Sequence, residues 1–280
     1  MIKTEKLVYN SANGDVQFEG TISYDDSIES LRPGILVCHA YGGHSEFDIK
    51  KSEQLTELGY FAFAMDLYGQ GRRGSNPQES MALMNEFNSN RTLLQDRMIH
   101  AFETLKKFDK VDESKTAAIG FCFGGKCALD LARAGEDIQG VISFHGLYDA
   151  PNTSIETNLN QTKKIDSSIL ILHGYDDPMA TPQNMIDLAD ELNFKKANWQ
   201  IHAYGNVGHA FTNPQADDKS SGLFYDAYAD QHSWQEMSNF LKKIFTFFDF
   251  LNLKFIFGLK YFLTKKYRKV SWIKPATDTP

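Results

Sequence analysis

The stretch that most constrains the fold is residues 117–125, with the sequence AAIGFCFGG. A short apolar run typical of a buried strand meets the pattern G-x-C-x-G-G, and a helical pattern follows directly over residues 126–133. A strand, a sharp turn and a helix form the context of a nucleophile elbow, which raises one side chain above the carboxyl edge of a sheet. Here that residue is Cys122, where serine is more usual. The sequence therefore predicts a thiol presented on a strand-to-helix turn.

Strand and helix patterns alternate along most of the remaining chain. An Asn13-Gly14 pair between two alternating runs predicts a hairpin within residues 5–24. Further strands are expected at 35–38, 60–67, 138–144, 169–172 and 199–204. Helices are expected at 46–58, at 79–108 with a break near 88–90, around 185–192 and at 223–245. This order predicts an α/β fold, with a mostly parallel sheet covered by helices on both faces, as one domain over residues 1–245.

Composition restricts the class of protein. The chain has 280 residues, a formal net charge of −7 and three cysteines, namely Cys38, Cys122 and Cys127. An odd cysteine count without C-x-x-C argues against a disulfide framework, and the N-terminus lacks the apolar stretch of a signal peptide. We therefore expect a soluble, cytoplasmic protein in which Cys38 and Cys127 are core residues. The acidic balance gives no indication of a nucleic-acid partner.

The end of the chain differs in kind from the rest. Residues 242–280 contain nine basic and two acidic residues, and seven phenylalanines lie between 245 and 262. Charges interrupt the apolar run, which disfavours a membrane-spanning helix. We treat 246–280 as an extension of unknown role. It could lie on an acidic membrane surface, dock onto the domain or a second subunit, or be a poorly ordered extension.

Three side chains with complementary chemistry follow strands in the order Cys122, Asp177, His209. Loops at the carboxyl ends of parallel strands gather at one edge of the sheet, where ligands bind. A nucleophile, an acid and a histidine in this order are typical of α/β-hydrolases. His209 would take the thiol proton, and Asp177 would orient the imidazole. Backbone amides of Phe123 and Tyr41 are the candidate donors to an oxyanion.

These motifs resemble the dienelactone hydrolase family. The resemblance rests on G-x-C-x-G-G at 120–125, H-G-x-D-D-P at 173–178 and G-H-A-F at 208–211, and it spans roughly residues 1–245. It implies an α/β-hydrolase fold, a Cys122–His209–Asp177 triad, hydrolysis of a small ester or lactone, and no metal or organic cofactor.

The resemblance is incomplete at two places. Where the family holds a glutamate near the resting thiol, this chain has Ala40. The family also has a serine directly after the histidine and, shortly beyond it, an arginine that holds a substrate carboxylate. Here Ala210 and Asn213 stand at these positions. Arg72, Arg73 and Arg91 are the candidates to supply a positive charge instead.

Several alternatives remain open at this stage. Asp176 competes with Asp177 for the role of the acid, although Asp177 before Pro178 fits the family better. Residues 69–74 match the dinucleotide pattern G-x-G-x-x-G, but Ser75-Asn76-Pro77 extends the loop where a helix should open, which favours a flexible loop. Strand-end histidines could be imagined as metal ligands, but they lack the spacing and partner carboxylates of a zinc site. They are His39, His44, His145, His173 and His202. A hydrolase-like binding or thiol-responsive protein is the alternative function, motivated by Ala40.

Overall fold

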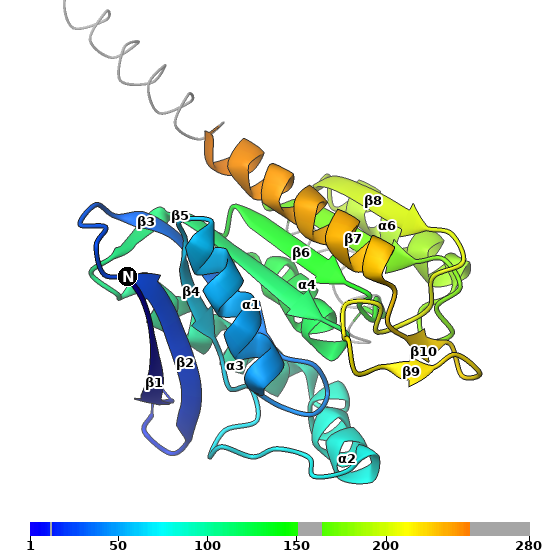
Figure 1. Ribbon diagram of the computed structural model, residues 1–280, viewed down its shortest axis with the longest axis horizontal. Coiled ribbons are helices and arrows are strands. Elements are labelled where there is room, and N and C mark those ends of the chain that lie inside the picture. The colour runs from blue at the N-terminus through cyan, green and yellow to red at the C-terminus, as the bar shows by residue number, and fades with distance from the viewer. Residues whose placement is uncertain (12, 151–163, 247–280) are drawn as a thin grey trace, which may run out of the picture.

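The computed structural model describes residues 1–11, 13–150 and 164–246 of the chain. Its centre is an eight-stranded sheet with the order β1-β2-β4-β3-β5-β6-β7-β8 (Figure 1). The strands are β1 (Ile2–Asn10), β2 (Gln17–Asp25), β3 (Arg32–Cys38), β4 (Phe61–Ala64), β5 (Val111–Phe121), β6 (Gly140–Phe144), β7 (Ser168–Gly174) and β8 (Asn198–Tyr204). Strands β3 to β8 are parallel, whereas β1 and β2 are antiparallel additions at one edge. The mostly parallel sheet predicted from the sequence is confirmed.

The predicted hairpin forms the antiparallel edge. Tyr9 in β1 pairs with Phe18 in β2, and their rings stack with centroids 4.9 Å apart. Gly14 adopts a φ of +81° in the turn, a conformation that costs glycine little. Ile22 in turn pairs with Phe63 of β4, so the hairpin extends the central sheet.

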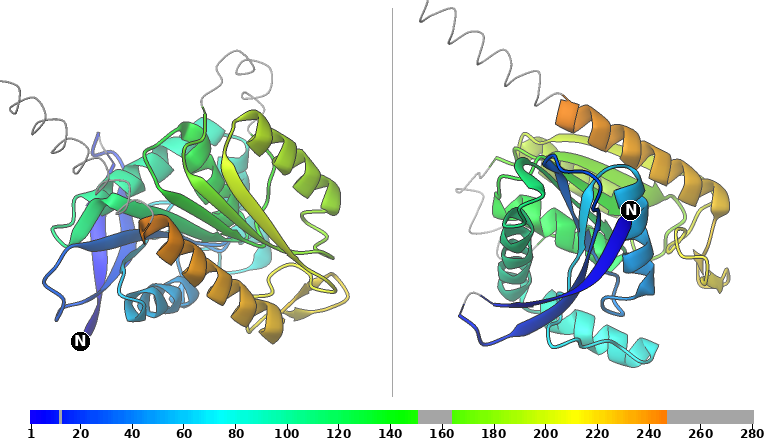
Figure 2. Two further views of the ribbon diagram at one scale, coloured as in Figure 1. Left: turned by 90° about the horizontal axis from the view of Figure 1, so that it is seen from above. Right: turned by 60° about the vertical axis from the view of Figure 1, so that its left-hand side comes forward.

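Helices cover both faces of the sheet, as the alternation predicted. They are α1 (Glu46–Glu57), α2 (Pro77–Asn88), α3 (Arg91–Lys106), α4 (Phe123–Ala134), α6 (Pro182–Phe194) and a last helix described over residues 227–246. Helix α1 and the helix 227–246 lie on one face, and α3, α4 and α6 lie on the other (Figures 1 and 2). The result is three layers with the sheet in the middle.

Burial on both sides explains why the central strands are continuously apolar. In β3, Leu36 belongs to the cluster that includes α3 and α4, and Val37 belongs to the cluster under α1 and the helix 227–246. Both side chains are completely buried, as successive residues of a strand covered on two faces should be. Full burial of an aliphatic side chain contributes about 2 kcal/mol, so both layers stabilise the sheet.

One element boundary agrees with the sequence pattern, and another differs from it. The expected break in the long helix is confirmed, because Asn90 accepts a hydrogen bond from the Leu93 amide at 3.0 Å and caps α3. The expected start of the last helix at residue 223 is wrong, since the helix begins at 227. Leu223–Phe224 instead form the short strand β10, which pairs with β9 (Asp217–Asp218). The Phe224 amide also donates to the His209 carbonyl at 3.1 Å, and this long-range pairing overrides the local helical pattern.

The basic extension expected at 246–280 lies, apart from residue 246, outside the described residues. Within the described part of the chain, no helix combines the length and hydrophobicity needed to cross a membrane.

Candidate active site

Cys122 occupies the turn between the last residue of β5, Phe121, and the first residue of α4, Phe123. Its φ of +55° and ψ of −117° lie outside the regions that non-glycine residues favour. The Cys122 amide donates to the Phe144 carbonyl of the neighbouring strand at 3.0 Å, and the Gly125 amide donates to the Cys122 carbonyl at 3.0 Å. A strained residue held by its neighbours is characteristic of a functional turn.

Glycine is required at two positions of the motif because neighbouring backbone atoms lie very close to them. The positive φ of the turn belongs to Cys122 and not to a glycine. A Cβ atom on Gly120 would lie 2.0 Å from the Gly124 carbonyl oxygen, and one on Gly124 would lie 2.1 Å from the Cys38 carbonyl oxygen. Neither distance is tolerable for a carbon atom, because backbone atoms cannot move aside as a flexible side chain could. The motif therefore allows α4 to start directly against β3 and β5.

Asp177 follows β7 and His209 follows β8, and the two side chains meet beyond the ends of these neighbouring strands. The His209 Nδ1 atom lies 2.7 Å from Asp177 Oδ2, and both residues are almost completely buried. The other carboxylate oxygen of Asp177 accepts the amides of Met179 at 2.7 Å and Ala180 at 3.2 Å, which holds the side chain in place. Asp176 is exposed and lies apart from this contact.

The thiol and the imidazole perturb each other electrostatically. Burial alone would raise the pKa of the Cys122 thiol, but the positive charge of His209 and the Phe123 amide keep it below its ordinary value. Burial would lower the pKa of His209, but the charge of Cys122 and the hydrogen bond to Asp177 raise it to about 10. The pair therefore favours thiolate and imidazolium at neutral pH.

The second nitrogen of the His209 ring, Nε2, is not bound by Asp177. This Nε2 atom is buried, and it is the ring nitrogen left for the interaction with the Cys122 thiol. With Nδ1 held by Asp177, Nε2 is the nitrogen that can exchange a proton with a neighbouring group.

Two further histidines, His145 and His173, lie close to His209 and Asp177. In the sequence, their position at strand ends was the only indication of this. The ring of His145 lies edge-to-face against that of His209 with centroids 5.0 Å apart, and its Nε2 is 2.8 Å from Thr212 Oγ1. The Tyr148 hydroxyl lies 2.9 Å from His173 Nδ1. Burial lowers the pKa of His145 well below its ordinary value and that of His173 to about 4, so both rings stay neutral at neutral pH.

The two backbone amides expected as oxyanion donors, those of Phe123 and Tyr41, have no backbone acceptor in the described parts of the chain. Phe123 begins α4, where the first amides have no acceptor within the helix, and its amide already interacts with the thiol. The Tyr41 amide, in the loop after β3, donates to no acceptor within the described parts of the chain. Both amides are therefore available as oxyanion donors.

Comparison with known proteins agrees with this architecture. A family model described as the dienelactone hydrolase family matches residues 19–245. The chain belongs to the dienelactone hydrolase family. A dienelactone hydrolase-like promiscuous phosphotriesterase from metagenomic libraries has a solved structure with a TM-score of 0.79 and 30% identity, covering 87% of this chain and 98% of that one. A protein of Aquifex aeolicus named as a candidate carboxymethylenebutenolidase is 27% identical over 215 residues, 75% of this chain and 87% of its own.

An uncharacterised protein of Caenorhabditis elegans is 36% identical over 154 residues, which is 54% of this chain and 94% of its own. The fold is that of the α/β-hydrolases, and the family makes this chain a hydrolase of the carboxylic ester and lactone type.

The three arginines considered for binding a substrate carboxylate are occupied elsewhere in this dienelactone hydrolase family member. Each pairs with a carboxylate: Arg72 with Glu86 at 2.9 Å, Arg73 with Asp66 at 3.2 Å, and Arg91 with Asp130 at 2.6 Å. Arg72 also donates to the Tyr68 carbonyl, and Arg91 also pairs with Asp149 at 2.9 Å. Because their charges are already compensated, we leave these arginines out of the proposed substrate site.

The glycine-rich loop at 69–74 is held by a carboxylate of the protein itself. Asp66, which is fully buried, accepts the amides of Gly69 at 3.1 Å, Gly71 at 3.3 Å and Glu19 at 3.0 Å. Amides that would cradle a phosphate in a dinucleotide site are therefore already used, and a second negative charge beside Asp66 would be repelled. The dinucleotide interpretation loses its structural basis.

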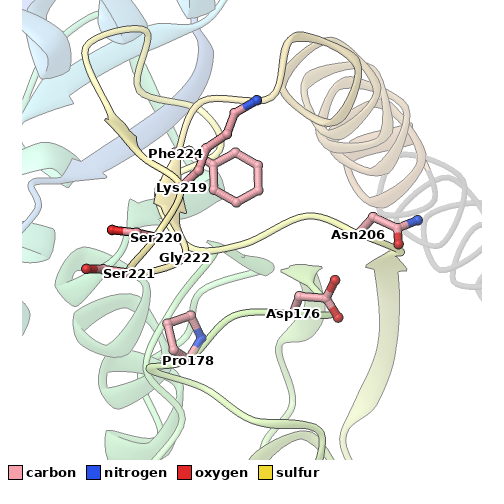
Figure 3. A pocket seen from close by; sticks show the side chains of 8 residues that line it. All are labelled: Asp176, Pro178, Asn206, Lys219, Ser220, Ser221, Gly222 and Phe224. Atoms are coloured by element: carbon pink, nitrogen blue, oxygen red, sulfur yellow. The ribbon is translucent and has the colours of Figure 1, made fainter.

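A surface pocket of about 570 Å³ lies beside the loop that carries Asp176 and Asp177 (Figure 3). Its lining includes Asp176, Pro178 and Gly222. The Gly222 carbonyl accepts the His209 amide at 2.8 Å, so this pocket backs onto the histidine loop. Cys122 is not among its lining residues. In residues 1–11, 13–150 and 164–246, no cluster of three His, Cys, Asp or Glu side chains is suited to a metal.

Proposed function

We propose that this protein hydrolyses small carboxylic esters or lactones through an acyl-cysteine intermediate, with Cys122, His209 and Asp177 as a catalytic triad. The observation that carries the proposal is the hydrogen bond of 2.7 Å between Asp177 and His209 Nδ1, which leaves the buried Nε2 atom to interact with the thiol on the strained turn. The lowered pKa of Cys122 supports a thiolate as the attacking group.

In the first step the Cys122 sulfur attacks the acyl carbon. A C–S bond forms and the π pair of the carbonyl moves onto its oxygen, which accepts hydrogen bonds from the Phe123 and Tyr41 amides. His209 Nε2–H then protonates the departing alkoxide as the C–O bond breaks, which leaves an acyl-cysteine and an alcohol. For a lactone the alcohol stays attached to the acyl group.

In the second step water attacks the acyl-cysteine. His209 Nε2 takes one water proton, the C–O bond to the incoming oxygen forms, and the C–S bond breaks to release the carboxylic acid and the thiolate. Asp177 keeps Nδ1 protonated throughout and stabilises the imidazolium. Ala40 cannot act as an acid on the resting thiol, so His209 must keep the thiol activated by itself.

The test is a rapid-mixing burst with p-nitrophenyl acetate followed by intact mass and peptide mapping of the quenched enzyme. We expect a burst and an acetyl group on Cys122, and Cys122→Ala should lower turnover about a thousandfold or more. Cys127→Ala is the matched control, because Cys127 lies buried in α4, the helix that Cys122 precedes, and burial raises its pKa well above the ordinary value. Turnover by folded Cys122→Ala at the unmodified rate would refute the mechanism.

The alternative, a hydrolase-like binding or thiol-responsive protein, predicts a different result. Folded and reduced protein would then form no acyl adduct with esters or with a panel of lactones, although it would still bind such a ligand.

A further inference from the structure

The loop that supplies the second oxyanion donor is held by side chains that the proposed mechanism does not use. This loop follows β3 and begins at His39, which is only 2% exposed. The Tyr41 amide has no acceptor in the described part of the chain, so its direction depends on how the peptide group that contains it is held.

The tautomer of His39 follows from its two contacts. The Leu67 amide donates to His39 Nε2 at 3.1 Å, so Nε2 must be unprotonated. Nδ1 therefore carries the proton of the neutral ring and donates to the Ala40 carbonyl at 2.7 Å. Burial lowers the pKa of His39 to about 4, which keeps the ring neutral at neutral pH. A single ring orientation and a single tautomer of His39 thus satisfy both hydrogen bonds.

The hydrogen bond from His39 determines where the Tyr41 amide points. The chain has no cis peptide bond among its described residues, so the Ala40 carbonyl and the Tyr41 amide point in opposite directions. The Gly43 amide also donates to the Ala40 carbonyl, at 3.1 Å. Because these hydrogen bonds hold the Ala40 carbonyl, they also hold the Tyr41 amide, which points in the opposite direction.

Tyr68 restrains the following peptide group. Its hydroxyl donates to the Tyr41 carbonyl at 2.8 Å, and its ring lies edge-on to that of His39 with centroids 4.8 Å apart. The charge of Cys122 contributes to raising the pKa of Tyr68, which is consistent with a position close to the thiol. The two side chains therefore hold the peptides on either side of the Tyr41 Cα atom.

We propose that His39, as a neutral Nδ1–H tautomer, is a positioning residue that aims the Tyr41 amide at the oxyanion, with Tyr68 restraining the adjacent carbonyl. This inference rests on the proposed acyl-cysteine function. It goes beyond the interpretation of His39 as an ordinary strand-end histidine, because it assigns the ring a role in the direction of one peptide group, that between Ala40 and Tyr41.

The first variant is His39→Phe, which keeps an aromatic ring beside Tyr68 and removes both hydrogen bonds. Losing one oxyanion donor lowers kcat by about 10²-fold, so we expect a fall of that order with KM within about threefold. His39→Gln is the conservative partner, since its amide can both donate to Ala40 and accept from Leu67. We expect its kcat to stay within about tenfold of the unmodified enzyme.

Two covalent probes separate positioning from general damage. Trifluoroacetophenone adds to a thiolate by forming a C–S bond while the carbonyl pair moves onto oxygen, so its adduct needs the oxyanion donors. Iodoacetamide alkylates the thiolate with loss of iodide and creates no oxyanion. We expect His39→Phe to weaken trifluoroacetophenone by about 10²-fold and to leave the alkylation rate of Cys122 within about twofold.

Each outcome has one meaning. Unchanged kcat and trifluoroacetophenone affinity in His39→Phe would overturn the inference, as would an equal loss in both probes, which indicates a damaged site. An unmodified enzyme that is alkylated but never acylated would overturn the proposed function itself. If His39→Phe does not fold, Tyr68→Phe provides the test. We expect its kcat to be about tenfold lower because one hydrogen bond is lost. An unchanged kcat would refute the proposal that these side chains hold the Tyr41 peptide groups.

Discussion

Acid sensitivity should come in part from His173, which is completely buried at the end of β7. Its pKa is about 4 in the folded protein because burial opposes the charged form, whereas an unfolded histidine has a pKa near 6.5. Between these values the unfolded chain binds more protons, so the free energy of unfolding falls as the pH falls. For these two pKa values the cost is about 2 kcal/mol at pH 5 and close to zero at pH 7.5.

The perturbation that isolates this contribution is His173→Gln. Glutamine carries no titrating ring, and its side-chain amide can either accept a hydrogen bond from the Tyr148 hydroxyl or donate one to it. We expect the variant to be less stable at pH 7.5 because it fills the site differently. Between pH 7.5 and pH 5, however, it should lose about 2 kcal/mol less than the unmodified protein.

Urea unfolding at a series of pH values, followed by tryptophan fluorescence and circular dichroism, measures this difference. His232→Gln is the control, because it makes the same substitution at an exposed position on the helix 227–246. If the stability of His173→Gln falls with pH as steeply as that of the unmodified protein, the assignment of a neutral buried ring to His173 is refuted.

Two other pairs of variants test the site and the turn. Asp177→Asn should lower kcat by about a hundredfold or more because the imidazolium loses its carboxylate, whereas steady-state kinetics of Asp176→Asn should agree with the unmodified enzyme within about twofold; equal losses would contradict the assignment of the acid. Gly124→Ala places a Cβ atom 2.1 Å from the Cys38 carbonyl oxygen and should cost about 3 kcal/mol or more of unfolding free energy. Gly205→Ala, with nothing within 4 Å of its new carbon, should show almost no change in the same urea titration, and similar values for the two would argue against tight backbone contact at the elbow.

The sequence predicted the parts of this protein that depend on local pattern. Periodicity and turn residues placed the hairpin at Asn13-Gly14 and the helix break near Asn90, because both depend on a few neighbouring residues. The order of strands and helices was enough for the mostly parallel sheet. Once that sheet is assumed, residues that follow its strands must gather at one edge, which is why the sequence alone groups Cys122, Asp177 and His209.

Long-range contacts decided what the sequence could not. The last helix begins at 227 rather than 223 because Phe224 bonds to the His209 loop, a contact across 15 residues of chain. The arginines looked available in the sequence, but partners such as Asp130 for Arg91 come from distant elements.

By itself, then, the sequence determined the class of fold and the chemical types at the candidate site. Only the tertiary structure decided protonation and direction. The neutral state of His173 depends on burial from all sides, and the tautomer of His39 depends on the Leu67 amide in the loop after β4. Solvation and hydrogen bonding of this kind arise from residues far apart in the chain, so no local pattern could encode them.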